Sequence, residues 1–335
     1  MRGASRTTPA TTIFYVVDSR GWIQHSRLES LRWHQARFRF RLLTTRRFAL
    51  LWRCGLLRRR PIYFATWRIV HGLLKRSPRL FRGDDFRYFM AAVTSHSNIG
   101  GGLDPQNPIP GRTVEEAYRL AVDLLGRFRY VTVNSRILHE LLAPGLENLL
   151  SCPNGVDASF FTPPPQLTFD PRLIRIGWVG KERGPKNFAA IEKACNILQE
   201  RGGFRAELLR VPKEFKRAPL NRDEMRRFYH GIDFYLCASW NEGTPNPALE
   251  AGACGLPVVT TRVGNMRELI EPGVNGFFIE PAVESIVDCF LSLRALRRED
   301  YAALRQAMRA RILQDWSWQV RIENFVDAFS RLTAP

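Results

Sequence analysis

Short apolar runs alternate with longer amphipathic stretches along the whole chain. In the first half this pattern predicts strands at Thr12–Val17, Arg37–Leu43, Pro61–Thr66, Phe89–Thr94, Tyr130–Asn134 and Asn148–Cys152. In the second half it predicts strands at Leu173–Val179, Ala206–Val211, Asp233–Ala238, Pro257–Thr261 and Gly276–Ile279, and helices at Asn187–Arg201, Arg222–His230, Pro247–Cys254, Asn265–Ile270 and Ala282–Leu296. Strands that alternate with helices are typical of parallel α/β units. The sequence therefore predicts an α/β protein.

A stiff segment, Thr162-Pro163-Pro164-Pro165, separates the two halves of this pattern. Proline neither continues a helix nor joins a β-ladder, so we expect a domain boundary there. The predicted domains are residues 1–162 and residues 166–318, each doubly wound. Two such domains facing each other would hold a cleft at the carboxyl ends of their strands, where open α/β sheets bind ligands.

Composition supports a folded, soluble chain but shows an uneven charge. The hydrophobic fraction of 45% and the charged fraction of 24% are average for globular proteins. The formal charge is +18, of which residues 1–166 carry +14 (25 basic and 11 acidic side chains) and residues 167–335 carry +4 (25 and 21). The first half is therefore expected to attract an anionic partner.

The cysteines and the apolar runs bear on where in the cell the protein is expected. None of the six cysteines forms a C-x-x-C pair, which favours free thiols in a reducing environment. The apolar run Ile13–Val17 ends at Asp18 and is shorter than a signal-peptide core. No run approaches the 18 or so apolar residues of a membrane span. We expect a cytoplasmic protein, or a peripheral one at the inner face of the membrane.

The segment from Ser239 to Val259 holds the candidate chemistry. A predicted strand leads into a loop rich in Gly, Pro and Asn and then into a helix. Asn246 is expected as N-cap and Pro247 as first helical residue. Free N–H groups in the first turn of that helix would bind an anion such as a diphosphate. Glu242 and Glu250 would both face this anion site.

The stretch from Glu242 to Val258 resembles the E-x7-E region of the family-4 retaining glycosyltransferases, also called group 1. Further segments match in register: Ile176–Lys181, Lys186, Val263-Gly264-Asn265 with Glu268, Gly273–Phe277, Val133–Ser135 and Pro153–Asp157. The resemblance covers residues 130–335 well and 1–128 loosely. It implies the GT-B fold, in which two Rossmann-like domains face each other across a cleft. It also implies a C-terminal helix, 319–335, that crosses back to the N-terminal domain.

The resemblance also implies roles for individual residues. Glu242 would bind hydroxyls of the donor sugar, and Glu250 would bind the nucleotide ribose. Lys181 and Lys186 would neutralise the donor diphosphate, where positive charge has most effect on a developing anion. The remaining implied residues are His96 near the donor sugar, Gly243, Thr244 and Asn246 at the nucleotide sugar, and Gly21 in a loop that lets a sugar approach closely.

Members of this family need neither a cofactor nor a metal, because basic side chains and helix N–H groups stabilise the phosphates. Two departures from the family pattern affect the expected phosphate geometry. Thr244-Pro245 stands where many relatives have Phe-Gly, and Lys181 stands where they usually have Arg. Proline lacks an N–H donor, and lysine offers a point charge instead of a bidentate fork.

The resemblance thus implies a retaining, metal-independent transfer by front-face displacement. The donor would be a UDP- or GDP-linked sugar, and the acceptor a hydroxyl of a saccharide or a lipid-linked saccharide. The alternative is a basic polyanion-binding protein on the same scaffold without transferase activity. No specific nucleic acid is expected as a partner, because the chain has no helix-turn-helix, zinc or RNA-recognition motif.

The basic excess is concentrated between residues 27 and 60, with eleven arginines and one acidic residue. Arg37, Arg39 and Arg41 alternate with apolar residues, which predicts a strand that is unsuited to a central position. The arginines from Arg46 to Arg60 bracket an apolar stretch that includes Trp52. This pattern fits a helix on an anionic membrane surface. It equally fits a helix packed on the sheet with its arginines in water.

Overall fold

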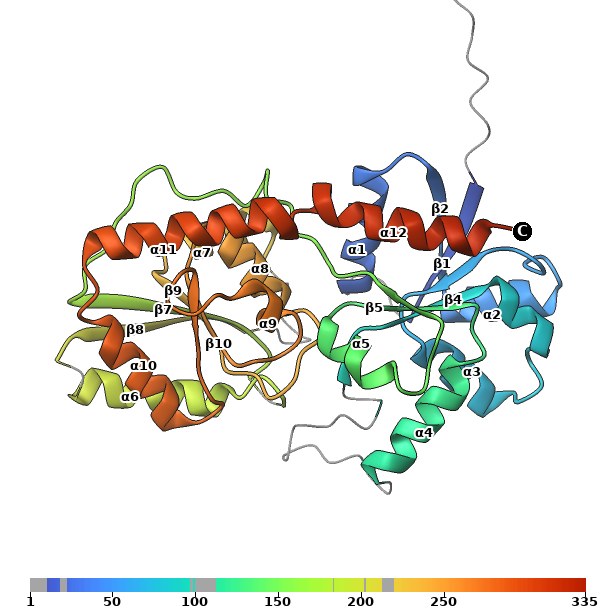
Figure 1. The fold of residues 1–335 in the computed structure, drawn as a ribbon, viewed down its shortest axis with the longest axis horizontal. Helices are drawn as coiled ribbons and strands as arrows, with labels where there is room; N and C mark the ends of the chain where they lie inside the picture. The colour runs from blue at the N-terminus through green and yellow to red at the C-terminus, as the bar shows by residue number, and fades with distance from the viewer. Residues whose placement is uncertain are drawn as a thin grey trace, which may run out of the picture. The chain divides into compact units, whose positions relative to one another are not determined.

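The computed structural model describes residues 11–18, 23–96, 99, 113–182, 184–201, 203–212 and 220–335. The chain forms two compact units (Figure 1). The first comprises Met1–Thr94, Tyr118–Pro153 and Arg321–Pro335, and the second Ser95–Ala117 and Asn154–Val320. The chain therefore enters the second unit before the proline segment. Val156, Ala158 and Phe161 belong to the core of that second unit.

Up to Pro153, the described chain alternates strands and helices as the pattern predicts. The strands are β1 (Thr11–Val17), β2 (Phe38–Thr44), β3 (Ile62–Phe64), β4 (Phe89–Val93), β5 (Tyr130–Val133) and β6 (Leu149–Ser151). The helices are α1 (Ile23–His34), α2 (Thr45–Arg53), α3 (Arg68–Arg76), the 3-10 helix η1 (Gly83–Tyr88), α4 (Val114–Leu125) and α5 (Arg136–Leu142). All six strands pair in parallel, in the order β2-β1-β3-β4-β5-β6.

The arginine-rich strand β2 lies at the edge of this sheet, as its charge pattern predicts. Phe38 and Phe40 are buried, whereas Arg39 and Arg41 are exposed. Pairing with β1 begins at Thr11↔Phe38 and ends at Val17↔Thr44. An edge position lets the charged face of the strand stay in water.

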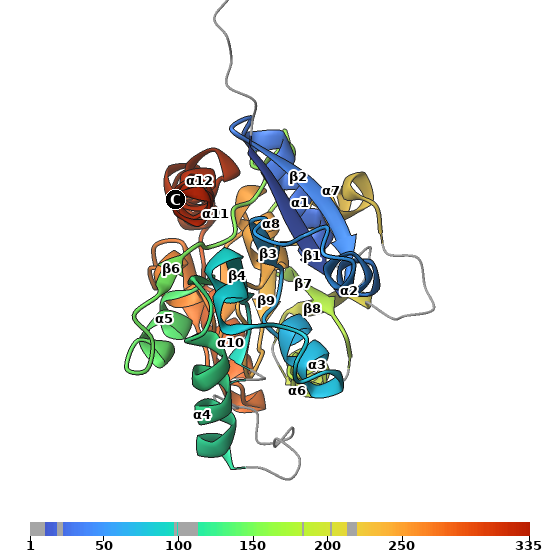
Figure 2. The same cartoon turned by 90° about the vertical axis from the view of Figure 1, so that its right-hand side faces the viewer.

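Helix α2 follows β2 directly (Figure 2). The Thr44 side chain caps it by accepting a hydrogen bond from the Arg47 N–H. Phe48 and Trp52 are fully buried, and the Trp52 ring packs edge-on against Phe89 with ring centroids 5.1 Å apart. The apolar face of α2 therefore belongs to the core. This agrees with the interpretation of the stretch as a helix that packs on the sheet with its arginines in water.

The C-terminal helix α12 (Trp318–Thr333) belongs to the first unit from Arg321 onward. The fully buried ring of Phe329 lies 5.9 Å from Phe38, 5.4 Å from Phe40 and 5.3 Å from Tyr63, measured between centroids. Arg129 donates a 2.9 Å hydrogen bond to the Ala334 carbonyl. The last residues of the chain thus contribute to the core formed with β1, β2 and β3.

The second unit contains a parallel sheet of strands β7 (Leu173–Gly180), β8 (Arg205–Pro212), β9 (Phe234–Cys237), β10 (Val258–Thr260) and β11 (Gly276–Phe278). Its helices are α6 (Phe188–Arg201), α7 (Arg222–His230), α8 (Asn246–Ala253), α9 (Met266–Leu269), α10 (Val283–Leu293), α11 (Arg298–Arg311) and the π-helical turn η3 (Ile312–Trp316). The strand order is β11-β10-β9-β7-β8.

The sheet order creates a switch point between β7 and β9. Strands β7 and β8 lie on one side of this point, and β9, β10 and β11 lie on the other. In open parallel sheets, ligands bind at the carboxyl ends of the strands that flank such a point. The loops after Gly180 and Cys237 are therefore the expected ligand-binding loops of this unit.

Helix α11 was not among the helices predicted from the sequence. Its buried residues Tyr301, Leu304 and Met308 follow helical spacing, and this pattern is readable in the sequence. Gly252 of α8 faces α11, since a Cβ atom there would lie 3.0 Å from the Met308 sulfur. A small residue at this position lets the two helices approach closely.

No helix in the described part of the chain combines the length and apolar character that a bilayer span requires.

Candidate functional site

Two loops meet at the switch point of the second sheet. The first follows β7 and runs from Lys181 to Asn187, and the second follows β9 and leads into α8. The Trp240 N–H donates a 2.8 Å hydrogen bond to the Pro185 carbonyl. This bond joins the loop that carries the predicted lysines to the loop that carries Glu242.

Lys186 and Glu242 form an ion pair between Nζ and Oε1. The side chains are 21% and 16% exposed, so the pair is mostly shielded from solvent. The Ser239 hydroxyl donates a 3.0 Å hydrogen bond to the same Glu242 oxygen. Thr261, after β10, donates a 2.7 Å bond to the Ser239 carbonyl and so anchors this turn to the sheet. The structure thus brings together two of the residues predicted to bind the donor.

The electrostatic environment keeps Lys186 charged. Burial alone lowers the pKa of Lys186, but the negative charge of Glu242 and its hydrogen bond outweigh burial and raise the pKa overall. The lysine stem passes close to Gly180, where an added Cβ atom would lie 3.2 Å from the Lys186 Cδ and Cγ. A glycine at the end of β7 therefore leaves room for the cation at the switch point.

The start of α8 differs from the prediction. The helix begins at Asn246, and Asn246 is not its N-cap. The Asn246 N–H donates to the Thr244 carbonyl (2.9 Å) and the Ala248 N–H to the Pro245 carbonyl (2.8 Å). Pro247 has no N–H to offer. The expectation of free N–H groups in this first turn is therefore wrong, because the loop carbonyls already accept from them.

The Asn246 side chain has another role in the structure. Its Oδ1 accepts a 3.2 Å hydrogen bond from Asn154 Nδ2. Asn154 is buried and belongs to the Pro153–Asp157 segment, where a Cβ atom on Gly155 would lie 2.7 Å from the Trp318 Cα. The structure thus fixes the amide of Asn246 against a tightly packed backbone turn.

Glu250 lies one turn inside α8, at the position predicted for a ribose ligand. Its Oε2 accepts a 2.7 Å hydrogen bond from the hydroxyl of Tyr229 in α7. Burial raises the pKa of Tyr235 in β9 well above its ordinary value, and the charges of Glu242 and Glu250 raise it further. The charges of both carboxylates therefore act on the same buried phenol.

His96 follows β4 and is buried, with 3% of its surface exposed. Neither ring nitrogen makes a well-formed hydrogen bond within the described residues. Burial lowers the pKa of His96, and the nearby backbone of Glu242 opposes this shift only in part. The structure therefore places a buried imidazole, whose pKa is lowered, close to the backbone of Glu242.

The remaining predicted residues are distributed as follows. Lys181 directly follows β7 and is exposed. Gly243 and Thr244 are buried next to Glu242, and a Cβ atom on Gly264 would clash with the Gly243 carbonyl. Gly21 lies outside the described residues.

Sequence reasoning missed the groups that hold the two glutamates. Ser239 lies three residues before Glu242, within hydrogen-bonding reach in a tight turn, and this spacing was a usable signal. Tyr229 shares the buried face of α7 with Met225, four residues earlier, so its hydroxyl needs a partner inside the unit. The contact of Tyr229 with Glu250 joins segments 21 residues apart and depends on the fold.

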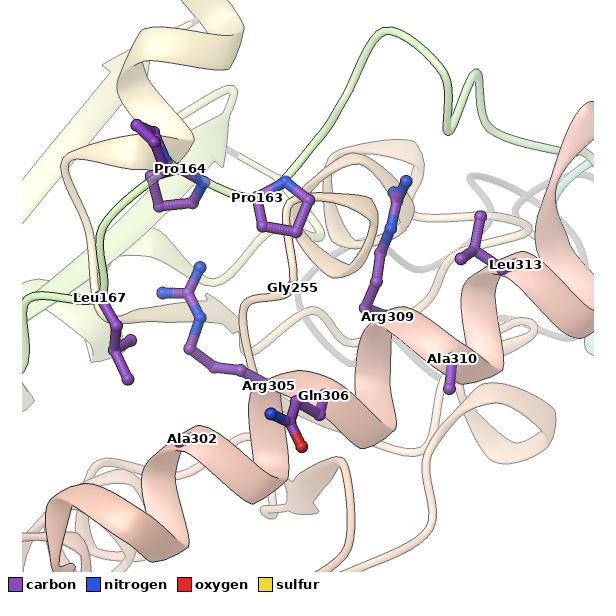
Figure 3. Close-up of a pocket in the computed structure, with 11 residues that line it drawn as sticks. Pro163, Pro164, Leu167, Gly255, Ala302, Arg305, Gln306, Arg309, Ala310 and Leu313 are labelled. Atoms are coloured by element: carbon purple, nitrogen blue, oxygen red, sulfur yellow. The ribbon is translucent and has the colours of Figure 1, made fainter.

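A groove elsewhere in the second unit lies between the proline segment and α11 (Figure 3). No predicted site residue lines it. Arg309 of α11 is among the lining residues and donates hydrogen bonds to the carbonyls of Ala158 (2.8 Å), Phe161 (2.9 Å) and Ala253 (2.5 Å). Burial lowers the pKa of Arg309. This arginine fastens the chain before the prolines to the end of α8.

Solved structures share this fold. Sucrose-phosphate synthase from Thermosynechococcus elongatus has a TM-score of 0.75 at 14% identity, with 96% of this chain and 99% of that chain covered. HepE from Anabaena, solved in complex with UDP and glucose, has a TM-score of 0.68 at 15% identity, with 96% and 99% covered. The chain has the GT-B fold with two Rossmann-like domains, and the predicted fold class is confirmed.

The sequence matches the family model of Glycosyl transferases group 1 over residues 178–295. D-inositol 3-phosphate glycosyltransferase from Geodermatophilus obscurus is 32% identical over 114 residues, which are 33% of this chain and 24% of that protein. The protein of the same name from Paenarthrobacter aurescens is 28% identical over 275 residues, 69% of this chain and 64% of that protein. The chain thus spans between about a quarter and just under two thirds of these relatives. The family resemblance inferred from the sequence is confirmed over residues 178–295 by this match to the group 1 family model.

Proposed function

We propose that this protein transfers a sugar from a nucleotide-diphosphate sugar to a hydroxyl of a saccharide or a lipid-linked saccharide. The observation that carries the proposal is the Lys186–Glu242 ion pair at the switch point, between the loops that follow β7 and β9. A cation there can neutralise a diphosphate, and a carboxylate can accept hydrogen bonds from sugar hydroxyls. Glu250 in α8 supplies a second carboxylate for the ribose.

The proposed reaction retains the configuration at the anomeric carbon and proceeds at one face of the sugar. The bond from the anomeric carbon to the β-phosphate oxygen breaks, and the acceptor oxygen forms the new glycosidic bond on the same side. The acceptor proton passes to the departing phosphate oxygen. Lys186, with Lys181 nearby in sequence, would stabilise the negative charge that grows on this leaving group.

The Lys186–Glu242 pair gives this site a way to respond to the donor. A phosphate that approaches Lys186 competes with Glu242 for the cation, and Glu242 then becomes able to accept from sugar hydroxyls. The site thereby exchanges one charge-assisted contact for two contacts with the donor. The residues of the site supply the positive charge themselves, so we propose that no divalent metal is needed.

The test is a panel of UDP- and GDP-linked sugars, screened for protein-dependent release of the nucleotide and for transfer to simple acceptors. Product stereochemistry follows from the anomeric coupling constant in the NMR spectrum. Transfer with retention that persists in EDTA supports the proposal. Strict dependence on Mn²⁺ or Mg²⁺ contradicts the metal-free mechanism, and inversion contradicts the front-face reaction.

We further propose that the first unit docks reversibly on an anionic membrane surface. The apolar face of α2 is used in the core, but Leu50 and Leu56 are 63% and 66% exposed. The surrounding exposed arginines are Arg46, Arg47, Arg53, Arg58, Arg59 and Arg60. Each basic residue close to an anionic bilayer contributes about 1 kcal/mol, so electrostatic attraction supplies most of the proposed affinity.

A further inference from the structure

Tyr229 makes a single directed contact with a residue of the proposed site. It lies in the last turn of α7, and its hydroxyl donates a 2.7 Å hydrogen bond to Oε2 of Glu250. The Tyr229 side chain is fully buried and its ring packs against Phe161 and Tyr235, with centroids 5.9 and 6.3 Å apart. The phenol is therefore held rigidly, while Glu250 is only partly buried.

In this hydrogen bond the Tyr229 hydroxyl is the donor and the Glu250 carboxylate is the acceptor. Burial and the neighbouring charge of Glu250 raise the pKa of Tyr229 well above its ordinary value, so the hydroxyl keeps its proton at any working pH. A protonated phenol can only donate to an ionised carboxylate. The bond therefore fixes one oxygen of Glu250 and the rotation of its carboxylate plane.

A glutamate side chain on a helix surface otherwise samples several rotamers. Ordering it at the moment of ligand binding weakens the binding, because the rotamer entropy is lost only then. A carboxylate that is already oriented by a buried neighbour avoids this loss. A hydrogen bond from a rigid neighbouring residue holds a binding group in the geometry that the ligand requires.

We propose that Tyr229 is a positioning residue, which holds the Glu250 carboxylate in the orientation that accepts hydrogen bonds from the two ribose hydroxyls of the donor nucleotide. This inference rests on the proposed function and adds a residue that touches no substrate. It predicts a specific signature: loss of the Tyr229 hydroxyl reduces the preference for ribose hydroxyls more than it reduces binding in general.

The experiment compares the binding of UDP and of 2′,3′-dideoxy-UDP to the full chain by calorimetry. The variant Y229F removes the hydroxyl and keeps the ring. The matched control is Y301F, because Tyr301 is also fully buried in the second unit and donates a 2.8 Å bond to the Asp233 carbonyl, outside the site. Thermal unfolding of both variants measures the general cost of losing one buried hydroxyl.

Wild-type protein and Y301F are expected to prefer UDP over the dideoxy analogue, and E250Q to lose most of that preference. In Y229F the preference should fall by about 10- to 100-fold, as for one lost hydrogen bond to a charged group. Y229F added to E250Q should cause no further fall, since Tyr229 acts through Glu250. An unchanged preference in Y229F, or an additive fall in the double variant, overturns the role of Tyr229 alone. Equal binding of both nucleotides by the wild-type protein overturns the ribose role of Glu250 and, with it, that of Tyr229.

Discussion

Lys186 and Glu242 are paired with each other. They are 56 residues apart in sequence, but their loops follow the neighbouring strands β7 and β9. The Ser239 hydroxyl shares the same carboxylate oxygen. The Lys186 ammonium, the Glu242 carboxylate and the Ser239 hydroxyl are thus connected to one another without a ligand. Substitutions in this group should affect ligand binding and the rate of reaction to different extents.

We expect E242Q to lower turnover by a factor of at least about 100, as for the loss of a charged contact to the reacting sugar. K186A should weaken UDP binding by about 10- to 100-fold, because a cation on the diphosphate is lost. K193A, an exposed lysine on α6, is the control and should bind and react as wild type. Steady-state kinetics and calorimetry measure both effects. Wild-type turnover in E242Q would show that the reaction takes place elsewhere.

Gly264 provides a geometric test of the site. It has a φ of 49°, and a Cβ atom there would clash with the Gly243 carbonyl. Gly273 has a φ of 77° but open space around it. G273A should therefore cost only about 1–2 kcal/mol for the left-handed backbone, with unchanged nucleotide binding. G264A should cost more and also weaken nucleotide binding, since the loop at Glu242 must move. Urea unfolding and calorimetry compare the two variants, and equal behaviour would argue against the close contact.

Asp233 gives a pH dependence of stability. Burial raises its pKa to about 6, despite opposing contacts from Arg175. Between the unfolded value near 3.8 and about 6, the native state binds the additional proton, so stability falls as pH rises. The free energy of unfolding of wild type relative to D233N should therefore fall by about 2–3 kcal/mol from pH 4 to pH 7. Urea unfolding at several pH values measures it. A constant difference between the two proteins would contradict the raised pKa.

Phe329 tests the contribution of α12 to the first unit. Its ring is fully buried against Phe38, Phe40 and Tyr63. F329A should destabilise the first unit by about 3–5 kcal/mol, as for truncation of a buried aromatic side chain. V320A removes a residue of the same helix that is 41% exposed and should cost under about 0.5 kcal/mol. Hydrogen exchange of the β1 and β2 amides locates the loss. Unchanged protection in F329A would mean that the helix does not support these strands.

Vesicle binding tests the proposed docking surface. Replacing Arg46, Arg47, Arg58, Arg59 and Arg60 with Gln should abolish co-sedimentation with vesicles that contain anionic lipid at low salt. The control replaces five exposed arginines of the second unit, Arg205, Arg267, Arg294, Arg297 and Arg298. Wild type and this control should bind, and binding should weaken at high salt as the Debye length shortens. Equal loss in both variants would indicate a general charge effect, and no binding by wild type would refute docking.

The sequence predicted the alternation of strands and helices along the chain, and the loop that carries Glu242, because both follow from local pattern. Strand β2 at the sheet edge was foreseeable from three alternating arginines. The start of α8 was mispredicted because Asn246 and Pro247 have the usual cap signature, whereas the Thr244 and Pro245 carbonyls take the first N–H groups. That choice depends on the loop path, which neighbouring segments such as Gly264 determine.

Side-chain partners were the least predictable part of the site. Glu242 and Glu250 were identified through a family resemblance, but neither Ser239 nor Tyr229 was identified as a partner. The partner of Glu250 depends on how α7 packs against α8. The spacing of residues within one segment does not predict the distance between two helices. The buried hydroxyl of Tyr229 was nevertheless a signal that a polar partner must exist.

The first unit is discontinuous: the chain leaves it between Thr94 and Tyr118, and again between Pro153 and Arg321. During synthesis on the ribosome, β1 and β2 therefore emerge long before Phe329, which covers the aromatic surface of Phe38 and Phe40. Until residues Arg321–Pro335 leave the exit tunnel, that surface has to remain soluble without its helix. The second unit, Ser95–Ala117 with Asn154–Val320, can complete its own core during this time. We therefore expect nascent chains stalled before Arg321 to have a folded second unit and to depend on chaperones for the first.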